Sequence, residues 1–165
     1  MVFKRKGKTC IGLDIDEKSI KLVELRKTPS EISLINWKIA SVIREEEDVS
    51  VSIVKTIKNL FAELKIEERN VHVSISGLSV ALRRMSLPKM PEEELKAGIR
   101  WEVRSLIPFP IEKAKIDYYI IGEISEEGIE KFDIIIVAAE ERALREHLNL
   151  LQGAELNAAS VTVNP

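Results

Sequence analysis

Three strand-like segments follow one another within residues 9–42, and they constrain the fold of this chain more than any other feature. Residues 9–16 are a largely apolar run, whereas residues 19–26 and 31–42 alternate apolar and polar side chains. A period of two residues is typical of a strand that buries one face. Because the links between the segments are short and polar, we expect an antiparallel meander.

A helix and a fourth strand follow the meander. Between Asp48 and Lys65, apolar residues recur with the spacing of one helical face. These residues are Ile53, Ile57, Leu60, Phe61 and Leu64. Residues 70–76 alternate again, and Gly77 closes the segment. We therefore expect residues 1–77 to form a β-β-β-α-β subdomain.

The second half of the chain opens with a strand and a helix. Residues 80–88 have the pattern of a strand, and Pro91 followed by three glutamates is typical of a helix start. The buried stripe expected for this helix consists of Leu95, Ile99, Val103, Leu106 and Ile107. Trp101 lies outside that stripe, which predicts that its side chain faces away from the core of its own subdomain.

A hairpin, a helix and a last strand are expected in the rest of the chain. Residues 115–124 and 129–139 have the pattern of the two hairpin strands. A helix over residues 140–152 is expected to stop at Gly153, and residues 158–165 again resemble a strand. We therefore expect residues 78–165 to form a second subdomain of order β-α-β-β-α-β, which makes the chain an α/β (α+β) protein.

Composition excludes several classes of protein. Lys and Arg number 25 against 27 Asp and Glu, so the net charge is −2 and a general nucleic-acid-binding role is not expected. Cys10 is the only cysteine, which excludes an intrachain disulfide and favours a reducing compartment. No run reaches the roughly 18 apolar residues that a membrane span needs. These features favour a cytosolic protein.

The segment "IGLDIDEKSIKLVEL", residues 11–25, carries the strongest chemical signal. It resembles the phosphate hairpin of actin-like ATPases, in which N–H groups of the turn cradle phosphates and an aspartate at the strand end holds Mg²⁺ through water. The resemblance implies that Asp14 is the metal residue, Ser19 a phosphate donor and Lys21 a charge partner. The implied cofactor-binding residues are Asp14, Asp16, Glu17, Lys18, Ser19 and Lys21.

The turn of this hairpin departs from the pattern of actin-like ATPases. That pattern has a small residue, usually glycine, where this chain has Asp16, and Glu17 follows. A like-charge pair about 4 Å apart costs on the order of 1 to 4 kcal/mol, so two carboxylates here disfavour a polyphosphate. A plain charged β-hairpin therefore stays open as the alternative to a phosphate loop.

Three further segments make the resemblance more specific. Residues 88–117 read "PKMPEEELKAGIRWEVRSLIPFPIEKAKID", residues 134–156 read "IIIVAAEERALREHLNLLQGAEL", and the chain ends in "VTVNP". Together with the hairpin, these segments resemble the PilM family of type IV pilus assembly proteins over nearly the whole chain from Thr9. The resemblance implies an actin-like (ribonuclease H-like) fold, similar to that of the cell-division protein FtsA, in which residues 78–165 are an inserted subdomain of the first lobe.

The family also binds ATP and Mg²⁺ between two lobes. We expect residues 1–165 to form no second lobe, and we therefore expect this chain alone to lack a closed nucleotide site. We accordingly expect no cofactor and no catalysis from this chain alone. A nucleotide-hydrolysing half-site that works by pairing with another chain is the enzymatic alternative.

The resemblance also implies a partner. PilM-like proteins are cytoplasmic scaffolds at the inner membrane, and they bind the short N-terminal cytoplasmic tail of PilN in a groove between the two subdomains. The candidate partner-binding residues are Trp101, Arg104, Ile107, Pro108, Phe109 and Pro110. Pro108 is expected to end its helix, and Phe109 belongs either to the core or to the groove. The equivalent cytoplasmic scaffold of type II secretion is an alternative, and homo-oligomerisation stays open.

Overall fold

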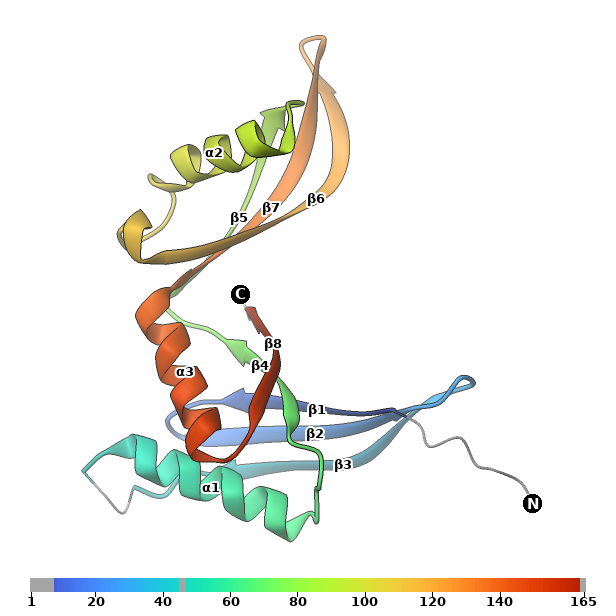
Figure 1. Cartoon of the computed structure of the whole chain (residues 1–165), viewed down its shortest axis with the longest axis vertical. Coiled ribbons are helices and arrows are strands. Elements are labelled where there is room, and N and C mark those ends of the chain that lie inside the picture. Colours follow the sequence, from blue (N-terminus) through green and yellow to red (C-terminus); the bar gives the residue numbers. More distant parts are fainter. Residues whose placement is uncertain (1–7, 45–46, 164–165) are drawn as a thin grey trace. The chain divides into compact units, whose positions relative to one another are not determined.

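The computed structural model describes residues 8–44 and 47–163. The chain divides into two compact units, Met1–Ile75 with Glu146–Thr162 and Ser76–Arg145 with Val163–Pro165. Each unit is built around a sheet of its own, with five strands in the first and three in the second (Figure 1). The predicted α/β class is confirmed.

The sheet of the first unit has the order β3-β2-β1-β4-β8. Its strands are β1 (Lys8–Ile15), β2 (Ser19–Lys27), β3 (Ile32–Ser41), β4 (Asn70–Ile75) and β8 (Asn157–Val163). β1, β2 and β3 form the expected antiparallel meander, and β4 pairs with β1 in parallel. The predicted β-β-β-α-β order of the first unit is therefore present.

Helix α1 (Val49–Glu63) covers one face of this sheet. The side chain of Asp48 caps its start by accepting a hydrogen bond from the Ser50 backbone N–H at 2.8 Å, which satisfies one of the free donors of a helix N-terminus. Ile53, Ile57 and Leu60 of the predicted stripe are buried. They pack with the inward side chains of β1, β2 and β4, so the apolar face of the helix and the apolar face of the sheet form one core.

Residues 146–162 belong to the first unit, which differs from the expected boundaries. We expected residues 78–165 to form the second subdomain, but its continuous part is Ser76–Arg145. Helix α3 (Glu141–Gly153) spans the division, and β8 lies beside β4, where the Asn157 N–H donates to the Arg69 carbonyl at 2.8 Å. Leu151 and Leu156 are buried in the first core, and a pattern of local periodicity cannot show which core they join.

Helix α3 ends at Gly153 as expected, but Gly153 does not have the left-handed backbone of a typical glycine stop. The residue with a left-handed backbone after α3 is Glu155, with a φ of 61°. Gly153 instead lies where a Cβ atom would come within 3.1 Å of Val54 Cγ2 on α1. The glycine is therefore used for close packing of α3 on α1, and the chain reverses two residues later.

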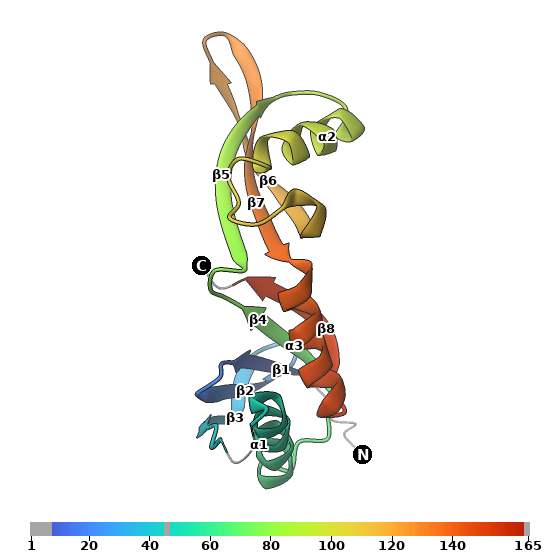
Figure 2. The ribbon, with the colours of Figure 1, turned by 90° about the vertical axis from the view of Figure 1, so that its left-hand side faces the viewer.

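The second unit is an antiparallel sheet with one helix on it. Its elements are β5 (Val80–Pro88), α2 (Glu92–Val103), the short 3₁₀ helix η1 (Ile111–Lys113), β6 (Ala114–Glu126) and β7 (Ile129–Glu140). The strand order is β5-β7-β6, and α2 lies along one face of the sheet (Figure 2). Since α3 and β8 contribute to the first unit, the observed order of the second is β-α-β-β.

The core of the second unit forms between α2 and β7. Leu95, Ile99 and Val103 are buried as expected, and they pack against Ile134 and Ile136. The expected stripe is too long, however, because α2 ends at Val103. The chain turns there, with the Leu106 N–H donating to the Val103 carbonyl at 2.9 Å, and Leu106 is exposed while Ile107 is half-buried.

Candidate phosphate turn and partner-binding surface

Asp14 lies at the end of β1 and is paired with two neighbouring strands. Lys21 Nζ on β2 donates to Asp14 Oδ2 at 2.7 Å, and Ser74 Oγ on β4 donates to Asp14 Oδ1 at 3.3 Å. The hydrogen bond from Lys21 to Asp14 and the attraction of the Asp14 carboxylate raise the pKa of Lys21. The structure thus brings Asp14 and Lys21 together as expected. Ser74 was not predicted, because only the parallel register of β1 and β4 places it beside Asp14.

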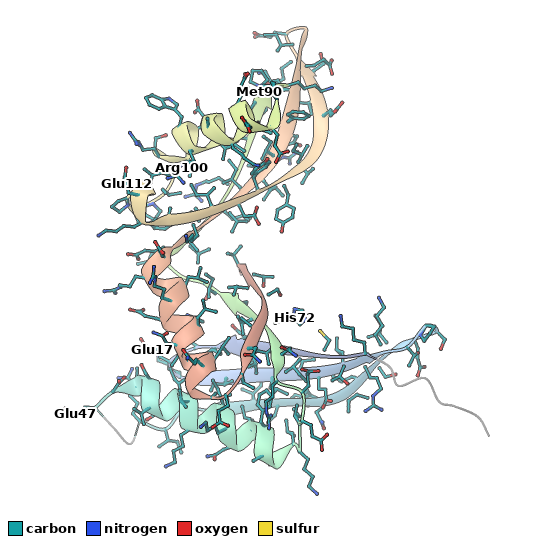
Figure 3. All side chains as sticks on the ribbon, in the orientation of Figure 1. Glu17, Glu47, His72, Met90, Arg100 and Glu112 are labelled. Carbon is teal, nitrogen blue, oxygen red and sulfur yellow. The ribbon has the colours of Figure 1, made fainter. Side chains whose placement is uncertain are left out.

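Residues 16–18 connect β1 to β2 in a short turn, and two of its backbone N–H groups are hydrogen-bonded within the hairpin. The Asp16 N–H donates to the Ser19 carbonyl at 3.0 Å, and the Lys18 N–H donates to Asp16 Oδ1 at 3.3 Å. Glu17, labelled in Figure 3, accepts a hydrogen bond from Arg44 Nη2 at 2.7 Å. The turn therefore brings the predicted residues together, but the N–H groups of Asp16 and Lys18 and the ammonium of Lys21 are directed at the protein's own carbonyl and carboxylate oxygens.

These residues do not fit a magnesium–phosphate site. A phosphate needs free N–H groups and uncompensated positive charge, whereas the turn amide of Lys18 already faces a carboxylate. Mg²⁺ usually keeps several of its waters and is bound by one or two carboxylates. The Asp14 carboxylate, however, already pairs with the ammonium of Lys21. Within residues 8–44 and 47–163, no three His, Cys, Asp or Glu side chains are grouped so that they would hold a metal ion.

Trp101 on α2 is the most prominent aromatic side chain of the second unit. It is 73% exposed, which agrees with its expected position outside the buried stripe. The guanidinium of Arg104 lies 5.9 Å from the centre of the indole ring, in the range of a cation–π contact. Arg104 also approaches Glu112 of η1 at 3.5 Å, and Figure 3 labels Glu112 and the neighbouring Arg100.

The corner after α2 combines exposed prolines with half-buried apolar side chains. Pro108 and Pro110 are exposed, whereas Ile107 and Phe109 are half-buried and pack against the core of the second unit. Pro110 also begins η1, where its carbonyl accepts the Lys113 N–H at 2.9 Å. The six candidate partner-binding residues thus lie within one segment, residues 101–110, in which Trp101 is exposed and Phe109 packs against the core of the second unit.

A second group of exposed apolar side chains was missed by the sequence prediction. Ile32, Leu34, Trp37 and Ile39 on the edge strand β3 are all more than half exposed. The expected strict alternation placed Leu34 and Trp37 on opposite faces. The register with β2 shifts between Glu24 and Leu25, so Ile35 has no partner and the alternation restarts after it. Such a shift depends on the neighbouring strand and leaves no local signal.

No helix in the described part of the chain is both long and apolar enough to cross a membrane.

The chain is thus an α/β protein of two units, each with a sheet and helical elements of its own. The family model of the type IV pilus assembly protein PilM matches residues 12–165, and the chain belongs to that family. Because the match covers both units, it confirms the family resemblance that we expected from the sequence.

Two solved structures are similar to this chain. One is from a PilM–PilN type IV pilus biogenesis complex, with 28% sequence identity and a TM-score of 0.77 over 94% of this chain and 47% of that chain. The other is the cytoplasmic domain of EpsL, an inner-membrane component of the type II secretion system of Vibrio cholerae, with 12% identity and a TM-score of 0.63 over 94% of this chain and 57% of that chain. This chain therefore spans about half the length of each, and the second likeness shows the fold alone.

Proposed function

We propose that this chain is a scaffold module of type IV pilus assembly that binds the N-terminal cytoplasmic tail of a PilN-like inner-membrane protein. In this proposal the module is cytoplasmic and reaches the inner membrane through its partner. The main support is the family membership together with the likeness to a chain from a PilM–PilN complex, which extends over 94% of the present sequence.

The segment from Trp101 to Pro110 is the proposed contact surface. Exposed aromatic and arginine side chains carry much of the binding energy in protein interfaces, and Trp101 and Arg104 already lie together. Phe109 fixes the other end of the segment because it packs into the core. An apolar side chain of the tail would gain contact with the indole without requiring the segment to rearrange, which keeps the entropic cost of binding low.

A titration with a synthetic peptide tests this proposal. The peptide carries the cytoplasmic N-terminal residues of the PilN-like protein from the same organism, and binding is measured by calorimetry. We expect Trp101→Ala to weaken binding by about 2 kcal/mol, roughly thirtyfold in Kd. Trp37→Ala is the matched control, since Trp37 is 66% exposed but lies in the first unit. Equal affinities of the wild type and Trp101→Ala would remove this surface from the proposal.

A further inference from the structure

The turn between β1 and β2 departs from the actin-like pattern at Asp16, and the proposed function gives this residue no role. Phosphate turns of that pattern present backbone N–H groups to an anion, and nearby positive charge strengthens the attraction. In this chain Asp16 stands where that pattern has a small residue, and its carboxylate accepts a hydrogen bond from the Lys18 N–H.

Two backbone donors of the turn, the Lys18 N–H and the Asp16 N–H, are already hydrogen-bonded. Asp16 Oδ1 accepts the Lys18 N–H at 3.3 Å, so a carboxylate oxygen lies where a phosphate oxygen would accept the same hydrogen bond. The second donor of the turn, the Asp16 N–H, is directed at the Ser19 carbonyl at 3.0 Å. An incoming phosphate would have to displace the carboxylate and then remain beside its negative charge.

Two of the nearby cations, Lys21 and Arg44, are engaged as well. Lys21 lies 2.7 Å from Asp14, and Arg44 lies 2.7 Å from Glu17. These pairs are partly solvated, and each is weak by itself. Together they neutralise part of the positive charge near Asp16 and Glu17 that would otherwise attract a polyphosphate.

We infer that the Asp16 carboxylate takes the place of a phosphate group in this turn, and that the hairpin of this chain is closed to nucleotide phosphates. The inference does not depend on the proposed function. It assigns Asp16 a definite role, which is to satisfy the amide that other turns of this kind leave free for a ligand. The hairpin then keeps one conformation whether or not ATP is present.

Three variants distinguish two effects of the Asp16 side chain: the hydrogen bond that it accepts from the Lys18 N–H, and its negative charge. Asp16→Gly removes both the carboxylate and its oxygen acceptor. Asp16→Asn removes the charge but keeps a side-chain oxygen that can accept the Lys18 N–H. Glu17→Gln removes the same charge from the neighbouring residue, whose carboxylate faces Arg44 and not the turn amide.

The experiment follows the backbone amides of the turn by NMR while inorganic pyrophosphate is added to the full chain, with sodium chloride at matched ionic strength as the reference. We expect no saturable shift in the wild type, Asp16→Asn or Glu17→Gln. Asp16→Gly is expected to show a saturable shift of the Lys18 amide, with an affinity at least about tenfold above any binding by the wild type. The same four proteins titrated with Mg-ATP are expected to rank in the same order.

Hydrogen exchange gives a test that needs no ligand. If the Asp16 carboxylate protects the Lys18 amide, this amide should exchange several-fold faster in Asp16→Gly, while Asp16→Asn keeps most of the protection. Saturable pyrophosphate binding at the wild-type turn would overturn the inference. So would a failure of Asp16→Gly to bind, an equal gain in Glu17→Gln, or exchange of the Lys18 amide at the wild-type rate in Asp16→Gly.

Discussion

Arg84 on β5 donates two hydrogen bonds to Asp133 on β7, from Nε to Oδ1 at 2.9 Å and from Nη2 to Oδ2 at 2.6 Å. Asp133 is only 8% exposed, so the fork of the guanidinium is the partner that offsets the removal of its carboxylate from water. We expect Arg84→Met to destabilise the second unit, because a nearly buried carboxylate would lose both donors. Urea unfolding measures the loss, and Lys96→Met, which breaks the exposed pair of Lys96 with Glu92 on α2, serves as the control that stays close to wild type.

The same pair predicts a dependence of stability on pH. The hydrogen bonds from Arg84 hold the pKa of Asp133 below its usual value of 3.8 in the folded state. A lowered folded-state pKa means that the stabilisation is complete well above 3.8 and is lost as the pH falls through the folded-state pKa. The stability difference between wild type and Arg84→Met should therefore be constant near neutral pH and shrink in acid. A difference that grows on acidification would contradict this assignment.

Gly153 and Val54 give a prediction about packing in the first unit. A Cβ at position 153 would lie 3.1 Å from Val54 Cγ2 and 3.5 Å from Val54 Cγ1, so a branched side chain cannot be accommodated without movement. We expect Gly153→Val to lower the free energy of unfolding by about 1–3 kcal/mol. Val54→Ala removes both methyl groups that clash, and the double variant should lose clearly less than the sum of the two single losses. Strict additivity would show that the two positions are not in contact.

The elements of this fold and the pairing of consecutive strands could be predicted from the sequence, whereas the pairing of segments far apart in the chain could not. The stripe of Ile53, Ile57 and Leu60 defines α1 because burial of one helical face leaves a pattern within the segment itself. The placement of β8 beside β4 depends on hydrogen bonds between residues far apart in the chain, and the periodicity of β8 suits either sheet. For this reason the order of the elements was predicted correctly while the boundary of the second unit was not.

The candidate site shows the same division. Asp14 and Lys21 are opposite each other in a hairpin, so their pairing follows from the turn length. Ser74 joins them only through the parallel pairing of β4, and the exposure of Leu34 together with Trp37 on β3 results from a register shift. Residues that meet through local structure can be found from the sequence, and residues that meet through tertiary pairing require coordinates.

The hairpin between β6 and β7 has a two-residue loop that requires left-handed backbone at both positions. Glu127 has a φ of 53° and Gly128 a φ of 80°, as in the tight turns that match the twist of antiparallel strands. We expect Gly128→Ala to destabilise the second unit by about 1 kcal/mol, because a Cβ disfavours this conformation. Glu127→Asn should stabilise it by a few tenths of a kcal/mol, since asparagine tolerates the left-handed region. Thermal unfolding of both variants checks the opposite signs, and equal signs would contradict the assigned turn.

Trp101 and Phe109 are aromatic residues of one segment, but we expect Phe109 to contribute to stability and Trp101 to peptide binding. Phe109 is half-buried and packs on the core of the second unit, so Phe109→Ala should lower the free energy of unfolding by about 1–3 kcal/mol. Trp101 is 73% exposed, so Trp101→Ala should change it by no more than about 0.5 kcal/mol. Denaturation of both variants by urea, followed by circular dichroism, separates the two effects.

Fluorescence extends this comparison to the proposed partner. The chain has two tryptophans, so Trp37→Phe leaves Trp101 as the single reporter. Its emission should be typical of a solvent-exposed indole in the free protein and should shift to shorter wavelength when the PilN-like peptide covers it. If Trp101→Ala loses peptide affinity at unchanged stability, the loss is not caused by unfolding. A shift of the Trp101 emission in Trp37→Phe then shows that the peptide covers Trp101, and the loss can be assigned to this contact. If the peptide binds without any shift in the emission of Trp101, the tail occupies another surface and the exposed end of α2 has no part in its recognition.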